Sequence, residues 1–151
     1  MWSGGNRIWR NVSFFVQESV QRMEKMKNRQ GKPSVEELAR ELGLEIVAGE
    51  KGSGRLIEDG YCGDLLSDVM GNAPPGCIWI TIQGHQNIVA VALLREMAAI
   101  VIAGGFTPDN DTVLRADQEG IPLLRWPGSS YELAGKLHAI GIKGEDPDKG
   151  K

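Results

Sequence analysis

Two polar turns near the middle of the chain carry the residue types best suited to bind a ligand. They follow two apolar runs, and their candidate binding residues are Gln83, Gly84, His85, Gln86, Asn87, Gly104, Gly105 and Thr107. Glutamine, histidine and asparagine offer neutral hydrogen bonds, and Gly84 allows a backbone to approach a ligand closely. The turns therefore predict a site for a small anion or a planar polar group.

Simpler roles for the same residues stay open. Asn87 can cap a helix, the pair Gly104-Gly105 can turn the chain, and His85 can bond to a neighbouring loop. In the binding interpretation, residues 83–87 lead into a helix, and the first amides of that helix are expected to be free donors for an anion.

Asp64, Ser67 and Asp68 form a second, weaker candidate group. Asp64 is placed to cap a helix running through Val69, and Ser67 and Asp68 fall on that helix. Two carboxylates four residues apart could serve a metal or acid–base chemistry, but no histidine lies nearby in the sequence. A structural role is expected, with no metal site.

Known catalytic patterns are missing from the sequence. It has no phosphate-binding loop, no nucleophile elbow and no zinc-binding His-Glu-x-x-His helix. The Gly-rich residues 49–54 precede a strand rather than a helix, which predicts a hairpin turn. His138 falls near a helix end, so His85 is the one credible acid or base. We therefore expect no catalytic residues and no enzyme activity.

Short apolar runs alternate with helical patterns along most of the chain. Ser34 and Glu37 form a capping box at the first of these helices. The expected helices cover residues 34–42, 64–69, 88–97, 109–119 and 129–141, and the expected strands residues 44–48, 55–61, 77–82, 99–103 and 121–126. This order predicts a three-layer α/β/α fold with one mainly parallel sheet, whose ligands collect at the carboxyl ends of the strands.

The chain divides into three expected parts. Residues 1–33 are predicted to be an N-terminal extension with an amphipathic helix, because Val12, Val16, Val20 and Met23 recur at helical spacing. Residues 34–142 form the α/β domain, and residues 143–151 are expected to be disordered. The apolar stripe of the extension predicts a homodimer. Met26 is an alternative start of translation.

Composition excludes several classes of protein. The 151 residues carry a net charge of −3, which does not favour binding to nucleic acid. No apolar run is long enough to span a membrane, and no secretory signal is recognisable, so we expect a cytoplasmic protein without membrane contacts. Cys62 and Cys77 are too few for a disulfide framework, and Cys77 is expected to be buried.

An ordered series of motifs resembles the DRTGG-domain family. The matching stretches are residues 63–70, 79–88, 100–108, 120–124 and 131–134. The resemblance implies a fold similar to the N-terminal domain of HPr kinase/phosphorylase. It also implies a regulatory module of the kind attached to phosphotransacetylases and CBS-domain pyrophosphatases, assemblies that bind adenine nucleotides. Relatives have Asp-Arg before the central helix, whereas this chain has residues 84–87, without an arginine.

Stand-alone members of that family occur in anaerobic bacteria, some beside iron-only hydrogenase subunits. The resemblance therefore implies a partner enzyme of hydrogenase or acetate-metabolism type. The leading hypothesis is a non-catalytic sensor that binds a small polar or anionic ligand, such as an adenine nucleotide, and signals to that partner. The alternatives are a structural interaction protein or adaptor with no ligand, and an enzyme that uses His85.

Overall fold

The computed structural model describes the backbone of residues 5–27 and 31–144, and the side chains of residues 10–21 and 31–144. The elements are α1 (Gly5–Lys27), α2 (Val35–Leu42), β1 (Glu45–Ala48), the 3₁₀ turn η1 (Glu50–Gly52), β2 (Asp59–Cys62), α3 (Leu66–Asn72), β3 (Cys77–Thr81), α4 (Asn87–Leu94), β4 (Ala99–Ile102), α5 (Asn110–Glu119), β5 (Leu123–Arg125) and α6 (Ser130–Ala139).

One sheet runs through the α/β domain, with its strands in the order β1-β5-β4-β3-β2. β2, β3, β4 and β5 are parallel to one another, and β1 pairs antiparallel with β5. The predicted three-layer fold with a mainly parallel sheet is confirmed. The parallel strands follow one another in chain order, so the loops at their carboxyl ends lie side by side along one edge.

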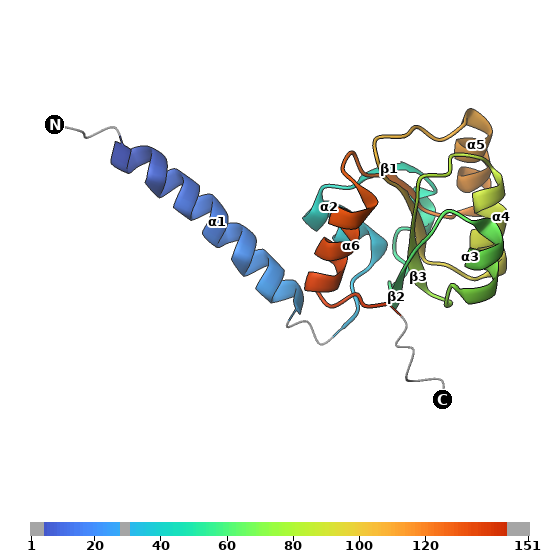
Figure 1. Ribbon diagram of the computed structural model, residues 1–151, viewed down its shortest axis with the longest axis horizontal. Helices are drawn as coiled ribbons and strands as arrows, with labels where there is room; N and C mark the ends of the chain where they lie inside the picture. Colours follow the sequence, from blue (N-terminus) through green and yellow to red (C-terminus); the bar gives the residue numbers. More distant parts are fainter. Residues whose placement is uncertain (1–4, 28–30, 145–151) are drawn as a thin grey trace.

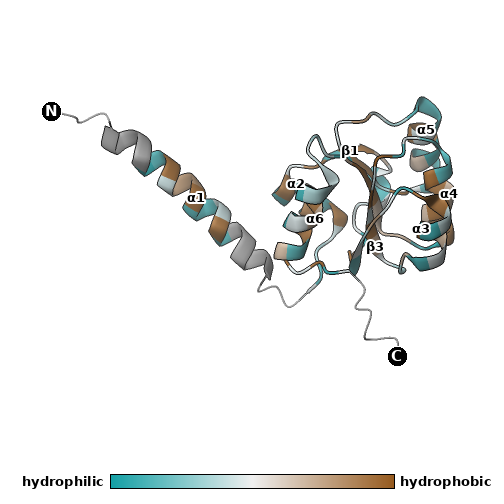
Figure 2. Ribbon diagram, in the orientation of Figure 1, coloured by the Kyte–Doolittle hydropathy of each residue, from teal (hydrophilic) through white to brown (hydrophobic). Residues whose placement is uncertain are grey.

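Helices cover both faces of this sheet (Figure 1). Side chains alternate along β3: Ile78 and Ile80 pack with α2 and α6, whereas Trp79 packs with α3 and α4. Every residue of β3 and β4 is buried, as expected for strands covered on both faces. Two apolar clusters therefore hold the sheet rigidly between the helical layers, and Figure 2 shows apolar residues along its strands.

Two helix starts follow the capping pattern of the sequence. The Ser34 hydroxyl accepts a hydrogen bond from the Glu37 amide at 3.1 Å, as the capping box predicts. The Ser129 hydroxyl accepts one from the Glu132 amide at 3.2 Å. These local bonds define where α2 and α6 begin.

The predicted hairpin at residues 49–54 is wrong. β1 and β2 lie at opposite edges of the sheet, so the segment between them crosses the domain. It contains η1 and is held to the end of α5: the Gly49 amide donates to Asp117 Oδ1 at 2.7 Å, and Lys51 Nζ donates to the Gln118 carbonyl at 3.0 Å. The strand expected from residue 55 begins only at Asp59.

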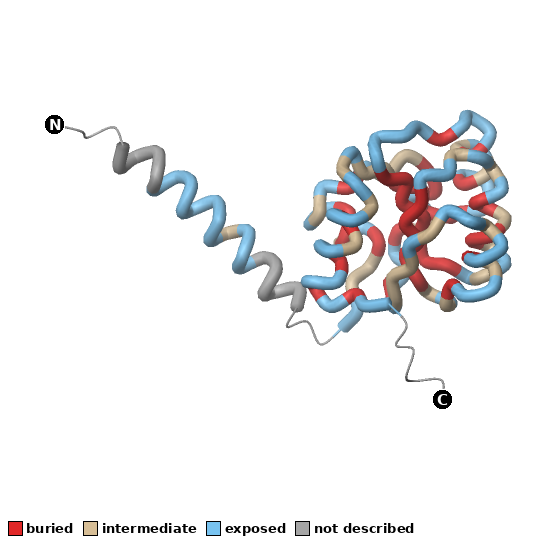
Figure 3. The backbone as a smooth tube through the Cα atoms, in the orientation of Figure 1, coloured by how far each residue is buried: buried red, intermediate tan, exposed pale blue. Residues whose placement is uncertain are grey.

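The predicted N-terminal amphipathic helix is confirmed as α1, which projects away from the α/β domain (Figure 1). Val12, Phe15, Val16 and Val20 are each between 47% and 67% exposed on it. In Figure 3, the described residues 10–21 of this helix are almost all exposed. The Met23 side chain and residues 145–151 lie outside the described residues.

Candidate functional site

The two predicted polar turns lie side by side at the carboxyl edge of the sheet. They follow β3 and β4, which are neighbouring parallel strands. The Ala103 amide donates to the Thr81 carbonyl at 2.9 Å, so the strands stay paired up to the point where the turns begin. Within the turns, Gln83, His85 and Thr107 are exposed.

Gly84 makes room for the chain itself. Its carbonyl accepts from the Asp109 amide at 3.0 Å and from the Thr112 hydroxyl at 2.7 Å. A Cβ at this position would lie 3.1 Å from the Thr107 carbonyl oxygen. The missing side chain therefore lets the two turns pack against each other. From the sequence, we had expected Gly84 to let the backbone approach a ligand.

The first amides of α4 are not free donors, and that prediction is wrong. The Asn87 amide donates to His85 Nδ1 at 3.1 Å, and the Ile88 amide to the His85 carbonyl at 3.1 Å. The Val89 amide donates to the Gln86 carbonyl. His85 thus caps the helix through its own ring, and Asn87 is the first helical residue rather than the cap. In the neutral ring, Nε2 then carries the hydrogen.

Gly104 and Gly105 turn the chain back toward the segment after β5. Both have positive φ, 77° and 75°, which glycine adopts without strain. The Gly104 amide donates to the Gly128 carbonyl at 2.7 Å, and the Gly105 amide donates to the Trp126 carbonyl at 3.2 Å. A Cβ on Gly104 would lie 3.0 Å from the Phe106 ring and 3.9 Å from Ile82 Cγ2. The Phe106 ring therefore lies over Gly104, next to Ile82.

Exposed apolar side chains follow each parallel strand, and the sequence analysis missed them. Leu65, Ile82, Phe106 and Tyr131 come after β2, β3, β4 and β5, and all four are exposed. Ile82 is 42% and Phe106 is 52% exposed. In the sequence, Ile82 is the last residue of the apolar run 77–82, and the other three lie beyond the apolar runs, beside polar residues. These positions were the signal that could have identified them. We call Ile82, Gln83, Gly104, Gly105 and Phe106 the carboxyl-edge surface.

Arg125 supplies a positive charge beside this surface. Its guanidinium donates to the carbonyls of Phe106 and Gly105, each at 3.4 Å. Glu45 on β1 approaches the same group at 3.7 Å. The arginine thus fixes the glycine turn and is partly neutralised by a carboxylate.

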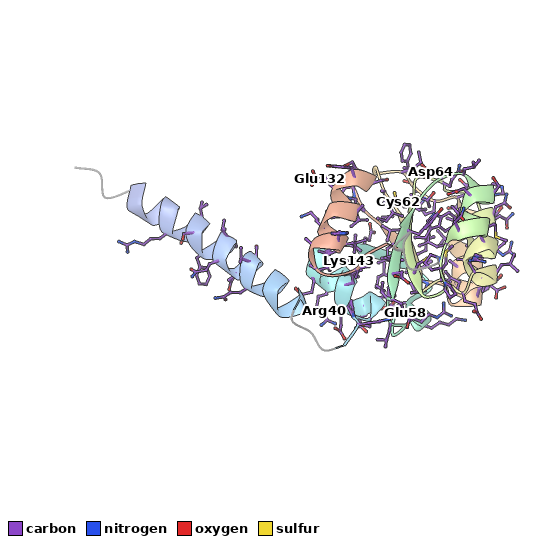
Figure 4. The ribbon with its side chains drawn as sticks, turned by 60° about the horizontal axis from the view of Figure 1, so that its bottom comes forward. Arg40, Glu58, Cys62, Asp64, Glu132 and Lys143 are labelled. Carbon is purple, nitrogen blue, oxygen red and sulfur yellow. The ribbon has the colours of Figure 1, made fainter. Side chains whose placement is uncertain are left out.

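Asp64 does not cap α3, which corrects the prediction. The cap position is Leu65, without a side-chain bond. Asp64 Oδ1 instead accepts from the Thr81 hydroxyl at 2.9 Å and from the Ile82 amide at 2.8 Å, because the end of β3 offers two donors at once. Figure 4 shows Asp64 close to the end of β2, near Cys62. Asp64 therefore holds the start of the first turn.

The other members of the second group point elsewhere. Asp68 accepts hydrogen bonds from the Tyr61 hydroxyl and from Asn72 Nδ2. Ser67 is exposed on α3. No group of three or more His, Cys, Asp or Glu side chains able to hold a metal occurs among the described residues.

Both cysteines are free thiols with raised pKa values. Partial burial, and then the Asp64 carboxylate, raise the pKa of Cys62. Burial first, and then Asp59, raise the pKa of Cys77 to about 12. Thiolates, not thiols, are nucleophiles, so neither residue is prepared for covalent chemistry.

The raised pKa of the Cys77 thiol predicts that the stability of the protein changes at alkaline pH. Its pKa is raised on folding from an ordinary value of 9.0, so its contribution is complete below pH 9.0 and is lost as the pH rises toward about 12. The free energy of unfolding of wild type minus that of Cys77→Ala should therefore stay constant up to about pH 9 and shrink as the pH rises above it. Urea unfolding of both proteins across this range checks it. A constant difference would contradict the shifted pKa.

The fold and its edge define a small three-layer α/β/α domain with a mixed aromatic and polar surface at the carboxyl ends of its strands. The chain belongs to the DRTGG domain family, whose model matches residues 35–140. This confirms the resemblance noted in the sequence. No curated protein matches the chain. None of the helices described is long and apolar enough to cross a membrane.

A solved structure shares the fold. It is the crystal structure of the CBS and DRTGG domains of the regulatory region of Clostridium perfringens pyrophosphatase, complexed with an activator, diadenosine tetraphosphate. The TM-score is 0.56 at 16% sequence identity, and the match covers 72% of this chain. This chain spans only 46% of the length of that one.

Proposed function

We propose that this chain is a non-catalytic regulatory domain that binds an adenine nucleotide at the carboxyl-edge surface. The observation that carries the proposal is the half-exposed Phe106 ring, which lies over Gly104 next to Ile82. An exposed aromatic ring beside a bare glycine turn offers a platform on which a planar base can stack. Stacking of this kind contributes about 1–3 kcal/mol per base.

Polar groups around the ring suit the edges of a base. The Gln83 side-chain amide donates to the Asp64 carbonyl at 3.3 Å and has a second hydrogen to offer. His85 and Thr107 are exposed in the same pair of turns. Arg125, which donates to the carbonyls of Phe106 and Gly105, is a cation that could meet a phosphate, although it also holds the glycine turn. We expect the base to provide most of the affinity, because the helix amides are already occupied.

Two observations support a regulatory rather than a catalytic role. His85, the one credible base, uses its Nδ1 to cap α4, and both thiols have raised pKa values. The structural neighbour is part of a regulatory region that was solved with an adenine-containing activator. From the family resemblance, we propose that this domain acts in the cytoplasm on a partner enzyme, of hydrogenase or acetate-metabolism type.

Phe106→Ala tests the site, because its ring is exposed and its loss should leave the core intact. Isothermal titration with AMP, ATP and diadenosine tetraphosphate should show at least one saturable ligand, bound roughly 5- to 100-fold more weakly by the variant. Leu114→Ala is the matched control, since Leu114 is 60% exposed on α5. Equal affinity for both variants, or no nucleotide binding to wild type, would refute the proposal.

We further propose that the protein is a homodimer formed through α1. The exposed stripe of Val12, Phe15, Val16 and Val20 is more apolar surface than a small monomer usually carries. Multi-angle light scattering should report a dimer for wild type and a monomer for Val16→Asp, which places a charge in the stripe. Gln17→Asp, on the exposed polar side, should remain dimeric. A monomeric wild type would contradict this contact.

A further inference from the structure

A hollow lies at the opposite, amino edge of the sheet. Its volume is about 400 Å³, within the range of small-molecule sites. Gly76, Ala98 and Ile121, which line it, come just before β3, β4 and β5. It is therefore separate from the carboxyl-edge surface, and Figure 4 shows the two ends of the sheet through Glu58, just before β2, and Asp64, just after it.

The floor of this hollow is apolar and its rim is charged. Ala92, Met97, Ala98 and Ile121 are almost fully buried beneath it, and Leu56 is 56% exposed at its side. Arg55 and Glu96 also line the hollow, and both are exposed. We call these residues, with Leu93 and Gly76, the amino-edge pocket.

The backbones that carry the two charges are firmly held. The Arg55 carbonyl accepts from the Val35 amide at 2.9 Å, and the Arg55 amide donates to the Gly52 carbonyl at 3.1 Å. The Glu96 carbonyl accepts from the Gly76 amide at 2.8 Å. Among the described residues, neither side chain has an ion pair or a hydrogen bond, so both charges are available to a ligand.

Glu96 also has a strained backbone. Its φ is +54°, and it is the one described residue other than glycine with a positive φ. Glycine usually occupies this position after a helix, and a side chain there costs about 1–2 kcal/mol. Strain of this kind is often found at functional sites, and here it belongs to a residue that lines the pocket.

We propose that the amino-edge pocket binds a zwitterionic small molecule with an apolar body, of which a large apolar α-amino acid is the simplest example. The guanidinium of Arg55 would pair with the carboxylate, the carboxylate of Glu96 with the ammonium, and the apolar side chain would enter the hollow. Charge complementarity favours this occupant over a nucleotide, because the Glu96 carboxylate that lines the pocket repels phosphate groups. The site is independent of nucleotide binding at the carboxyl edge.

Titrations with L-leucine and L-phenylalanine, each up to about 10 mM, test the pocket by calorimetry and by amide shifts. We expect saturable binding of at least one amino acid, with shifts around residues 55–56, 76, 92–98 and 121. Each amino acid has two matched analogues, one without the ammonium and one without the carboxylate. They are 4-methylpentanoate and 3-methylbutylamine for leucine, and 3-phenylpropanoate and 2-phenylethylamine for phenylalanine. Each analogue should bind about tenfold or more weakly than the amino acid that it matches.

Variants separate the pocket from general effects. Arg55→Gln and Glu96→Gln should each weaken binding of the amino acid by about tenfold or more, while Arg40→Gln and Glu41→Gln, which change the same residue types on α2, should leave it unchanged. Phe106→Ala should also bind the amino acid normally, even if it loses the nucleotide. The proposal would be overturned if neither amino acid bound saturably, or if both analogues bound as tightly as the amino acid. It would also be overturned if Arg55→Gln and Glu96→Gln both bound the amino acid as tightly as wild type.

Discussion

Replacing Trp79 by alanine should lower the free energy of unfolding by about 3–5 kcal/mol, the range for truncating a large buried aromatic side chain. Trp79 has no exposed surface and lies in the middle of β3, within the cluster that joins the sheet to α3 and α4. Its Nε1 also donates to the Gly63 carbonyl at 2.8 Å, which the variant leaves without this partner. Urea unfolding measures the loss.

Trp126 provides the matched control for this change. Its ring is half-buried on the other face, and its Nε1 donates to the Ser129 carbonyl at 3.2 Å. Trp126→Ala removes the same atoms from a partly solvated place, so it should destabilise the protein clearly less than Trp79→Ala. Equal losses at the two positions would contradict the central place of Trp79 in the core.

Gly49→Ala should destabilise the protein by more than about 4 kcal/mol, or prevent folding, because a methyl group cannot fit. A Cβ on Gly49 would lie 1.9 Å from the Ile121 carbonyl oxygen, and the φ of Gly49 is +69°. The Ile121 carbonyl oxygen belongs to the backbone, so it cannot move aside cheaply. The change also displaces the amide that donates to Asp117. Thermal unfolding or soluble yield would show the effect.

Gly43→Ala separates the two causes of this loss. Gly43 has a similar φ of +71°, but no atom lies within 4 Å of its Cβ position. Gly43→Ala should therefore lower the free energy of unfolding only by the cost of the left-handed conformation for alanine, about 1–2 kcal/mol. If Gly49→Ala were no worse than Gly43→Ala, the close approach to Ile121 would be wrong.

Local and periodic features of this fold could be predicted from the sequence. The apolar runs at β3 and β4 indicated buried parallel strands, and so placed residues 83–87 and 104–107 at one edge. Ser34 caps its helix through a bond to a residue three positions away, which a sequence pattern can show. Signals that depend on near neighbours were interpreted correctly.

Features set by distant contacts could not be predicted in the same way. Asp64 has the residue type of a helix cap, but its carboxylate binds the end of β3, 17 and 18 positions further on. Residues 49–54 resemble a hairpin turn, but β1 pairs with β5, and Gly49 bonds to Asp117, 68 positions away. Gly84 serves a contact with residues 107–109. In each case the local pattern suits two roles, and only tertiary packing selects one.

The sequence correctly indicated that the two turns lie at one edge of the sheet, but their exposed apolar side chains were not anticipated. Polar residues in the turns were predicted to bind the ligand, because caps and hydrogen-bonding groups are easily recognised in a sequence. Phe106 and Ile82 were not predicted to belong to the site, since an apolar residue at or just beyond the end of a strand is normally assigned to the core. Their exposure is evident only in the three-dimensional structure, in which the Phe106 ring lies against Gly104.

Mapping the nucleotide-induced shifts of the backbone amides tests most directly whether the carboxyl-edge surface binds a nucleotide. Nucleotide binding at the carboxyl-edge surface predicts that titration of the ¹⁵N-labelled protein with AMP, ATP or diadenosine tetraphosphate shifts amides at residues 82–87 and 104–107, in a saturable manner. Residues of the amino-edge pocket, such as Leu56 and Glu96, should stay still. Shifts confined to that pocket or to α1, or no saturable shift with any of the three nucleotides, would contradict nucleotide binding at the carboxyl-edge surface.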